Sequence, residues 1–143
     1  MATDQKDGEF SGIWYCGYSF PSNQHEGEDI SEYYAVVHQR GNKLTVQSLP
    51  NKEESIMQVK LTVDDDLATG YWEEGTSPHG EFAGAIYSGA LQLLVSKDGK
   101  RMEGRWVGVG QDHGKRNIYG GTWKMHRAGS KEAAAAQSAL ENK

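Results

Sequence analysis

Turn-forming residues interrupt this sequence at short, regular intervals. Gly41-Asn42 and Asp98-Gly99 are two-residue connections whose residues accept a positive φ at low cost, as tight β-hairpin turns require. The aspartates at 64–66 divide the chain in the same way, and so does the segment 76–80. Longer connections are expected at 21–29, 50–55 and 111–115. The segments between these turns predict eight strands, at about 10–20, 31–40, 43–49, 56–63, 67–75, 81–96, 100–110 and 117–127.

Alternation of side-chain character supports the strand assignment. In segments 57–63, 101–109 and 121–126, one type of side chain recurs at every second position, which places it on one face of a strand. Strand 81–96 is too long to run straight through a domain of this size, so we expect a bend or bulge near Gly89. In the second strand the inward set is open between two alternatives: Tyr33, Ala35 and Val37, or Tyr34, Val36 and His38.

Consecutive strands joined by short turns form an up-and-down meander, and eight strands are enough to close a barrel without exposed edges. The sequence therefore predicts an all-β, eight-stranded antiparallel barrel over residues 9–128. Residues 1–8 are expected to be disordered. Residues 129–143 are expected to form a short helix or a disordered tail, because Ser130 is a possible N-cap and alanines follow it, but little apolar surface is offered for packing.

Composition excludes several classes of function. The net charge of −5 and the scattered basic residues argue against nucleic-acid binding. No apolar stretch has the length of a membrane span. The single cysteine, Cys16, cannot form an internal disulfide, and residues 1–10 do not resemble a secretion signal, so we expect a cytoplasmic protein.

Each of the four tryptophans, Trp14, Trp72, Trp106 and Trp123, follows a glycine by two positions. In a strand this spacing puts glycine and tryptophan on one face, so that a large ring can lie over the space left by a neighbouring glycine. Core packing explains such a pattern for any one ring. An aromatic-walled cavity is the alternative, in which one or two rings contact a ligand.

If the tryptophans point inward, parity places polar residues inside as well. Tyr18, Glu74, Tyr119 and Arg127 then line the interior, together with Cys16. A buried charge requires water, a partner or a ligand, so this lining is more polar than packing alone demands. The lining favours a binding cavity.

Gly12-Ile13-Trp14 resembles the G-x-W opening of the calycin superfamily, which includes lipocalins, fatty-acid-binding proteins and avidins. In lipocalins a basic residue of the last strand packs across that tryptophan, and Arg127 is the positional match. The usual lipocalin secretion signal and disulfide are absent from this sequence. The resemblance implies a ligand-binding barrel.

A closer resemblance covers about residues 10–127. Segments 69–74, 76–78, 87–94 and 104–108 look like a bacterial barrel module that also occurs at the C-terminus of helix-turn-helix regulators. The module implies no particular activity. No helix-turn-helix segment is found in this sequence, so DNA binding is not expected.

Other chemistries find less support. The run Gly104–Gly110 resembles the G-x-W-x-G-x-G motif of nitrobindin-like haem barrels, but haem would need an axial histidine inside, and His38 is the only candidate. No metal site is expected. Cys16 with His38 lacks a third group to orient a nucleophile. We therefore expect no cofactor, with haem as the alternative.

The sequence is best interpreted as a non-enzymatic barrel that binds a small apolar or aromatic molecule. One alternative is a cavity isomerase or hydrolase that uses Glu74. Another is an interaction or sensory module with a solid core. Oligomeric state is left open. The expected ligand-binding residues are Trp14, Tyr18, His38, Trp72, Glu74, Trp106, Tyr119, Trp123 and Arg127.

Overall fold

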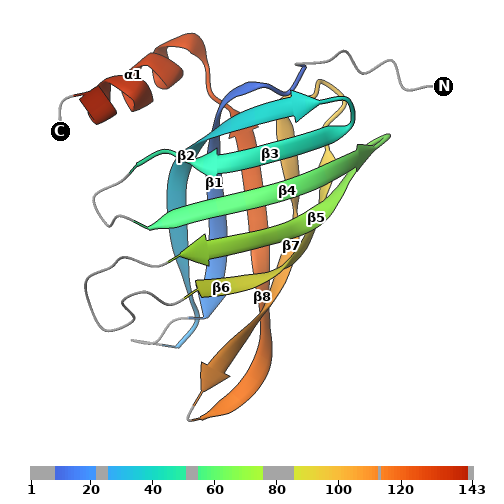
Figure 1. The fold of residues 1–143 in the computed structure, drawn as a ribbon, viewed down its shortest axis with the longest axis vertical. Helices are drawn as coiled ribbons and strands as arrows, with labels where there is room; N and C mark the ends of the chain where they lie inside the picture. The colour runs from blue at the N-terminus through green and yellow to red at the C-terminus, as the bar shows by residue number, and fades with distance from the viewer. Residues whose placement is uncertain (1–8, 22–25, 51–54, 76–85, 113, 142–143) are drawn as a thin grey trace.

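The computed structural model describes residues 9–21, 26–50, 55–75, 86–112 and 114–141. Eight antiparallel strands form one closed barrel in sequence order, as predicted (Figure 1). The strands are β1 (Gly12–Pro21), β2 (Glu28–Arg40), β3 (Lys43–Ser48), β4 (Ile56–Asp64), β5 (Leu67–Gly75), β6 (Ile86–Val95), β7 (Arg101–Asp112) and β8 (Lys115–Arg127). No helix in this part of the chain has the length and apolar character that a membrane span requires.

Several strand boundaries differ from those expected. β2 begins at Glu28 because its first residues pair with the end of β1. β7 and β8 remain paired as far as Asp112 and Lys115, so a tight hairpin replaces the expected loop at 111–115. The expected start of the sixth strand, 81–85, lies outside the described residues.

Glycines make room for tryptophan rings on neighbouring strands. A Cβ atom on Gly108 would lie 2.5 Å from Trp72, and one on Gly89 would lie 2.8 Å from the same ring. A Cβ on Gly121 would approach Trp106 to 2.7 Å. The expected pairing of small and large residues is therefore present. Of the bend or bulge expected near Gly89, a bulge is absent from the described part of the strand, because β6 pairs with β5 without interruption from Ile86 to Leu94.

The two ends of the barrel interior differ. At the apolar end, where the β2–β3, β4–β5 and β6–β7 hairpins lie, Leu44, Val46, Leu93 and Met102 are each 1% exposed. At the other end the interior residues are mainly aromatic and only partly buried, and we call this the aromatic end. It contains Tyr18, Phe20, Tyr33, Tyr87 and Tyr119. Solvent therefore reaches the interior residues of the aromatic end far more than those of the apolar end.

The barrel wall is less regular at the aromatic end. The β1–β8 ladder stops at Tyr18 and Trp123, and beyond it the hydroxyl of Ser19 accepts a hydrogen bond from the Thr122 N–H at 2.8 Å. The β7–β8 hairpin continues past its neighbours and projects below the rest of the barrel in Figure 1. Side chains thus replace ladder bonds where the strands separate.

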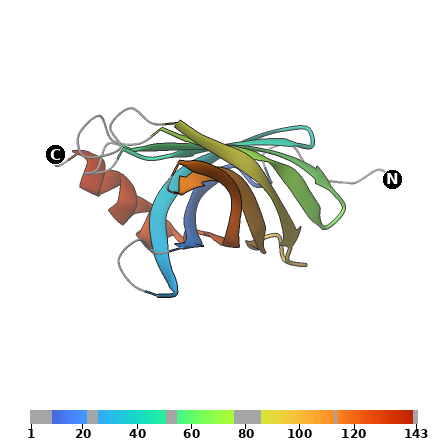
Figure 2. The same cartoon turned by 90° about the horizontal axis from the view of Figure 1, so that it is seen from below.

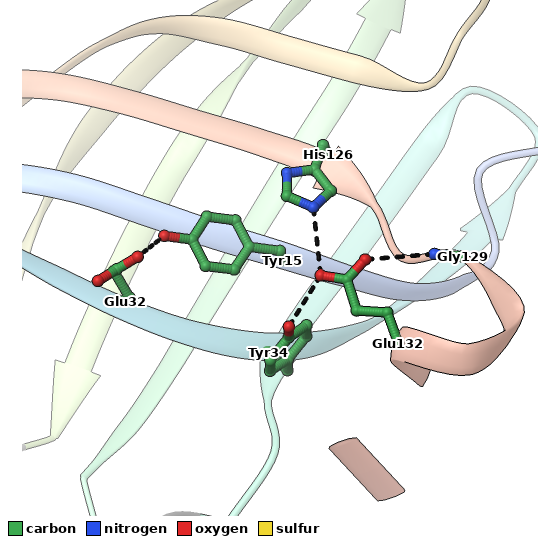
Figure 3. A network of polar contacts seen from close by, with 6 residues as sticks. All are labelled: Tyr15, Glu32, Tyr34, His126, Gly129 and Glu132. Carbon is green, nitrogen blue, oxygen red and sulfur yellow. Dashed lines mark hydrogen bonds and ion pairs between the residues drawn. The ribbon is translucent and has the colours of Figure 1, made fainter. Parts of the chain in front are cut away.

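Of the two alternatives for the tail, the structure has the helix. α1 (Ser130–Glu141) lies outside the barrel, at its side (Figures 1 and 2). The Glu132 carboxylate accepts hydrogen bonds from the Tyr34 hydroxyl at 2.8 Å and the Gly129 N–H at 3.3 Å, and it lies 3.3 Å from His126 Nε2 (Figure 3). One side chain therefore tethers the helix to the barrel's outer face.

Candidate functional site

Tyr18 is the centre of an aromatic cluster at the aromatic end. Its ring stacks on Trp123, with centroids 5.2 Å apart and planes inclined by 15°. It meets Trp106 edge-to-face at 6.3 Å and Tyr33 in the same manner at 6.4 Å. Phe20 lies tilted against it at 5.9 Å. Parity on β1 directs Tyr18 inward, and the curvature of the barrel brings rings of β2, β7 and β8 to it.

A hydrogen bond crosses the barrel within this cluster. The Tyr18 hydroxyl donates to Glu74 Oε2 at 3.2 Å. Tyr18 lies on β1 and Glu74 on β5, and these strands occupy opposite sides of the closed strand order. The pair therefore joins opposite walls at the aromatic end, as expected from the inward parity of both residues.

Burial shifts the pKa values of Glu74 and of the neighbouring Tyr33. Burial raises the pKa of Glu74, and the hydrogen bond from Tyr18 partly opposes that shift. Burial also raises the pKa of Tyr33 well above its usual value, and the nearby Cys16, Tyr18 and Glu74 act in the same direction. Within the described residues no cation pairs with Glu74. Its carboxyl group is consequently a half-buried acid for which the described residues provide no counter-ion.

The four indole N–H groups have different partners. Trp14 donates to the Phe10 carbonyl at 2.8 Å, Trp72 to the Val107 carbonyl at 3.1 Å and Trp106 to the Ser19 carbonyl at 2.7 Å. Trp123 is 1% exposed, and its Nε1 has no hydrogen-bond partner among the described residues. An indole N–H only donates, so Trp123 lacks an acceptor.

A second buried donor lacks a partner nearby. The Tyr33 hydroxyl makes no hydrogen bond of normal geometry with the described residues, although the Cys16 thiol lies beside it. Burial raises the pKa of Cys16 to about 12, so this thiol stays protonated and is a poor nucleophile. The cluster thus has two unmet buried donors, the Trp123 N–H and the Tyr33 O–H, both on rings that contact Tyr18.

Most of the residues predicted for the site meet at this end. Trp106 contacts both Tyr18 and Trp72, the latter edge-to-face at 5.4 Å, and Tyr119 is partly buried on the same end of β8. Together with Trp123 and Glu74 they form one polar-aromatic cluster.

Two predicted site residues, Trp14 and Arg127, lie at the apolar end of the barrel. Trp14 belongs to the apolar end, where Arg127 lies 6.0 Å above its ring centroid. Arg127 also donates hydrogen bonds to the carbonyls of Glu9 and Ser11. Arg127 therefore fastens the N-terminal segment to β8, and the prediction that it shares a cavity with Glu74 is wrong. Parity gave the correct face, but both residues lie near the C-terminal ends of their strands. Because β5 and β8 run in opposite directions, the two residues lie at opposite ends of the barrel.

His38 does not face the interior. It is exposed, and the inward residues of β2 are Tyr33, Ala35 and Val37. Its predicted place in the site is wrong, because the β1–β2 register pairs Ala35 with the inward Trp14. A Cys16–His38 nucleophile pair is excluded by the same geometry. His126, the other described histidine, stacks on Tyr15 on the outer face, so neither offers an axial ligand for haem.

The sequence interpretation missed Tyr33 as a site residue, and it did not include Phe20 or Tyr87 in the predicted site. The signal for Tyr33 was its parity, which remained ambiguous because both faces of β2 carry aromatic and apolar residues. Only pairing with β1 resolves the choice.

No cluster of three metal-ligating side chains occurs among the described residues. Comparison with known proteins finds no family model and no curated protein that matches this sequence. The fold is a closed antiparallel barrel with an aromatic cluster at one end, and Arg127 lies over Trp14 at the other end. Function is therefore argued from the geometry of that cluster.

Proposed function

We propose that this barrel is a non-enzymatic binding protein for a small molecule with an aromatic or apolar body, held at the aromatic end. The observation that carries the proposal is the pair of unmet buried donors, on Trp123 and Tyr33, beside the Tyr18–Glu74 hydrogen bond. Leaving a buried donor unpaired costs about 1–3 kcal/mol, and a bound acceptor removes that cost. An ordered water takes this role when no ligand is bound.

Binding at the mouth of the barrel fits the packing better than binding deep in the lumen. Trp106 contacts both Trp72 and Tyr18 inside the barrel, and Phe10 packs against Trp14 at the apolar end. The partly buried rings of Phe20, Tyr33 and Tyr119 are those that a ligand could cover. Covering apolar surface contributes about 25 cal/mol per Å².

An enzymatic role for Glu74 is the second candidate. Its raised pKa and its hydrogen bond with Tyr18 are features that general acid–base catalysis uses. The other groups in the cluster do not complete a catalytic set, because the Cys16 thiol is buried and protonated and His38 lies outside. We therefore prefer simple binding.

The class of protein and its cellular compartment are part of the same proposal. The calycin-like pattern of Trp14 and Arg127 and the likeness to a bacterial barrel module support a small-ligand carrier or sensor. The free, buried Cys16 is compatible with a reducing cytoplasm, where we place the protein.

A neutral fluorescent dye tests the proposal. N-phenyl-1-naphthylamine, whose emission rises in apolar surroundings, should bind the full chain with one site. Tyr18→Leu removes the ring at the centre of the cluster and should weaken dye binding about tenfold or more, because four ring contacts are lost.

The matched control is Tyr71→Leu, which removes a ring that is 55% exposed on the outer face of β5. It should leave the dissociation constant unchanged. If the dye does not bind, or if Tyr71→Leu alone abolishes binding, the aromatic end is not the site.

A further inference from the structure

Resting on the proposed binding at the aromatic end, we infer that the ligand presents the edge of a neutral cyclic amide, in which a carbonyl acceptor lies beside an N–H donor. The cluster itself specifies this edge. Its unmet groups are two donors on rings that contact Tyr18, and the half-buried carboxyl group that pairs with Tyr18 offers an acceptor.

The donors require an acceptor on the ligand. The Trp123 N–H cannot accept a hydrogen bond, so only an oxygen or nitrogen lone pair satisfies it. The Tyr33 O–H is unpaired as well, and both rings contact Tyr18. A carbonyl oxygen has two lone pairs, so a ligand carbonyl can accept from either group.

The carboxyl group requires a donor on the ligand. Tyr18 occupies Glu74 Oε2, and the described residues provide no partner for Oε1. An N–H adjacent to the ligand carbonyl would donate to that oxygen. A cyclic amide holds its N–H and C=O on the same edge of a planar ring, so one group meets both requirements.

Charged ligands fit less well. A cation would pair with Glu74 and be attracted by the ring faces, but it would leave the Trp123 N–H without an acceptor. An anion would satisfy that N–H but would face the Glu74 carboxylate, which no described cation neutralises. A neutral edge avoids both penalties.

Four probes with one bicyclic skeleton test this inference by isothermal titration calorimetry on the full chain. They are 2-quinolone, which carries the amide edge, naphthalene, which has no polar edge, the N-methylquinolinium cation and the 2-naphthoate anion. We expect 2-quinolone to bind about tenfold or more tightly than naphthalene, because it satisfies buried donors. The two ions should bind more weakly than 2-quinolone.

Two variants test which side chains cause the preference for 2-quinolone over naphthalene. Tyr33→Phe removes one unmet hydroxyl and Trp123→Phe removes the unmet N–H, and each should reduce the preference for 2-quinolone over naphthalene. Tyr33→Phe deletes a single oxygen, so it keeps the test valid if Trp123→Phe fails to fold. Tyr87→Phe is the control, since this partly buried tyrosine at the same end is not among the unmet buried donors.

The outcomes separate the two proposals. If none of the four probes binds, the proposed function fails and the inference fails with it. If naphthalene binds as tightly as 2-quinolone, or if either ion binds more tightly, the barrel is a binding protein but the amide edge is wrong. Equal probe preferences in the wild type and both variants would also overturn the assignment of the donors.

Discussion

The four tryptophans have the same sequence spacing, but their indole N–H groups differ in hydrogen bonding. All four follow a glycine by two positions, and all four are at most 7% exposed. Trp14, Trp72 and Trp106 each donate to a backbone carbonyl, which ties a ring to the wall. Trp123 has the same spacing but no such acceptor among the described residues. Its buried N–H is the one indole donor of the four without a backbone acceptor in that part of the chain.

This difference predicts that the same substitution destabilises the protein to different extents at the two positions. Trp106→Phe leaves the Ser19 carbonyl without its donor at the point where β1 separates from β8, and it also leaves a cavity. It should lower the free energy of unfolding by about 2–4 kcal/mol. Trp123→Phe loses similar volume but removes an unpaired buried N–H, so its cost should be smaller by about 1–3 kcal/mol. Urea denaturation of both variants measures the difference, and equal losses would contradict it.

Among the elements, α1 owes its stability more to contacts with the barrel than to the helix propensity of its own residues. Twelve residues form a marginal helix in isolation. The contacts of Glu132 with Tyr34, His126 and Gly129 hold its first turn against the outer face (Figure 3). These contacts lower the pKa of Glu132, the hydrogen bond from Tyr34 contributing most.

We expect the attachment of α1 to depend on pH. Because the folded-state pKa of Glu132 lies below its ordinary value of 4.5, the stabilisation is complete above pH 4.5 and is lost as the pH falls through the lowered pKa. Glu132→Gln should imitate this loss at neutral pH. Tryptic cleavage after Lys131 should then accelerate about two- to fivefold, since the group is largely solvent-exposed and each bond is weak. Unchanged cleavage would show that the helix is held by other contacts.

Across the whole molecule, the barrel has an apolar end that Arg127 fastens and an aromatic end where binding is proposed. At the apolar end Arg127 joins β8 to the N-terminal segment through two carbonyls and covers Trp14. At the aromatic end Ser19 and Ser48 accept backbone N–H groups where the ladders stop. If the proposed function is correct, the contacts of Arg127 and the ligand contacts lie in different regions of the barrel.

Arg127→Met tests this separation. Methionine keeps an apolar stem over Trp14 but loses the charged hydrogen bonds to Glu9 and Ser11. The free energy of unfolding should fall by about 1–3 kcal/mol, visible as a melting temperature lower by several degrees. Dye affinity at the aromatic end should not change. Weakened dye binding without loss of stability would place Arg127 in the binding site after all.

The sequence by itself determined the strand count, the meander order and the inward direction of the tryptophans. Turn residues such as Gly41 and Gly99 adopt the positive φ that their hairpins require, at 62° and 71°. These features depend on local φ preferences and on the two-residue period of a strand, so neighbouring residues alone specify them. The inward placement of Tyr18 and Glu74 followed from the same parity.

Only the tertiary structure decided which inward residues meet. Parity places Arg127 and Glu74 on the same face, yet their positions along β8 and β5 put them at opposite ends of the barrel. The inward choice of Tyr33 over His38 required the register with β1, and the donors left unpaired on Tyr33 and Trp123 appear only when every other partner is in place. Register and barrel closure are properties of paired strands, and no single strand's sequence contains them.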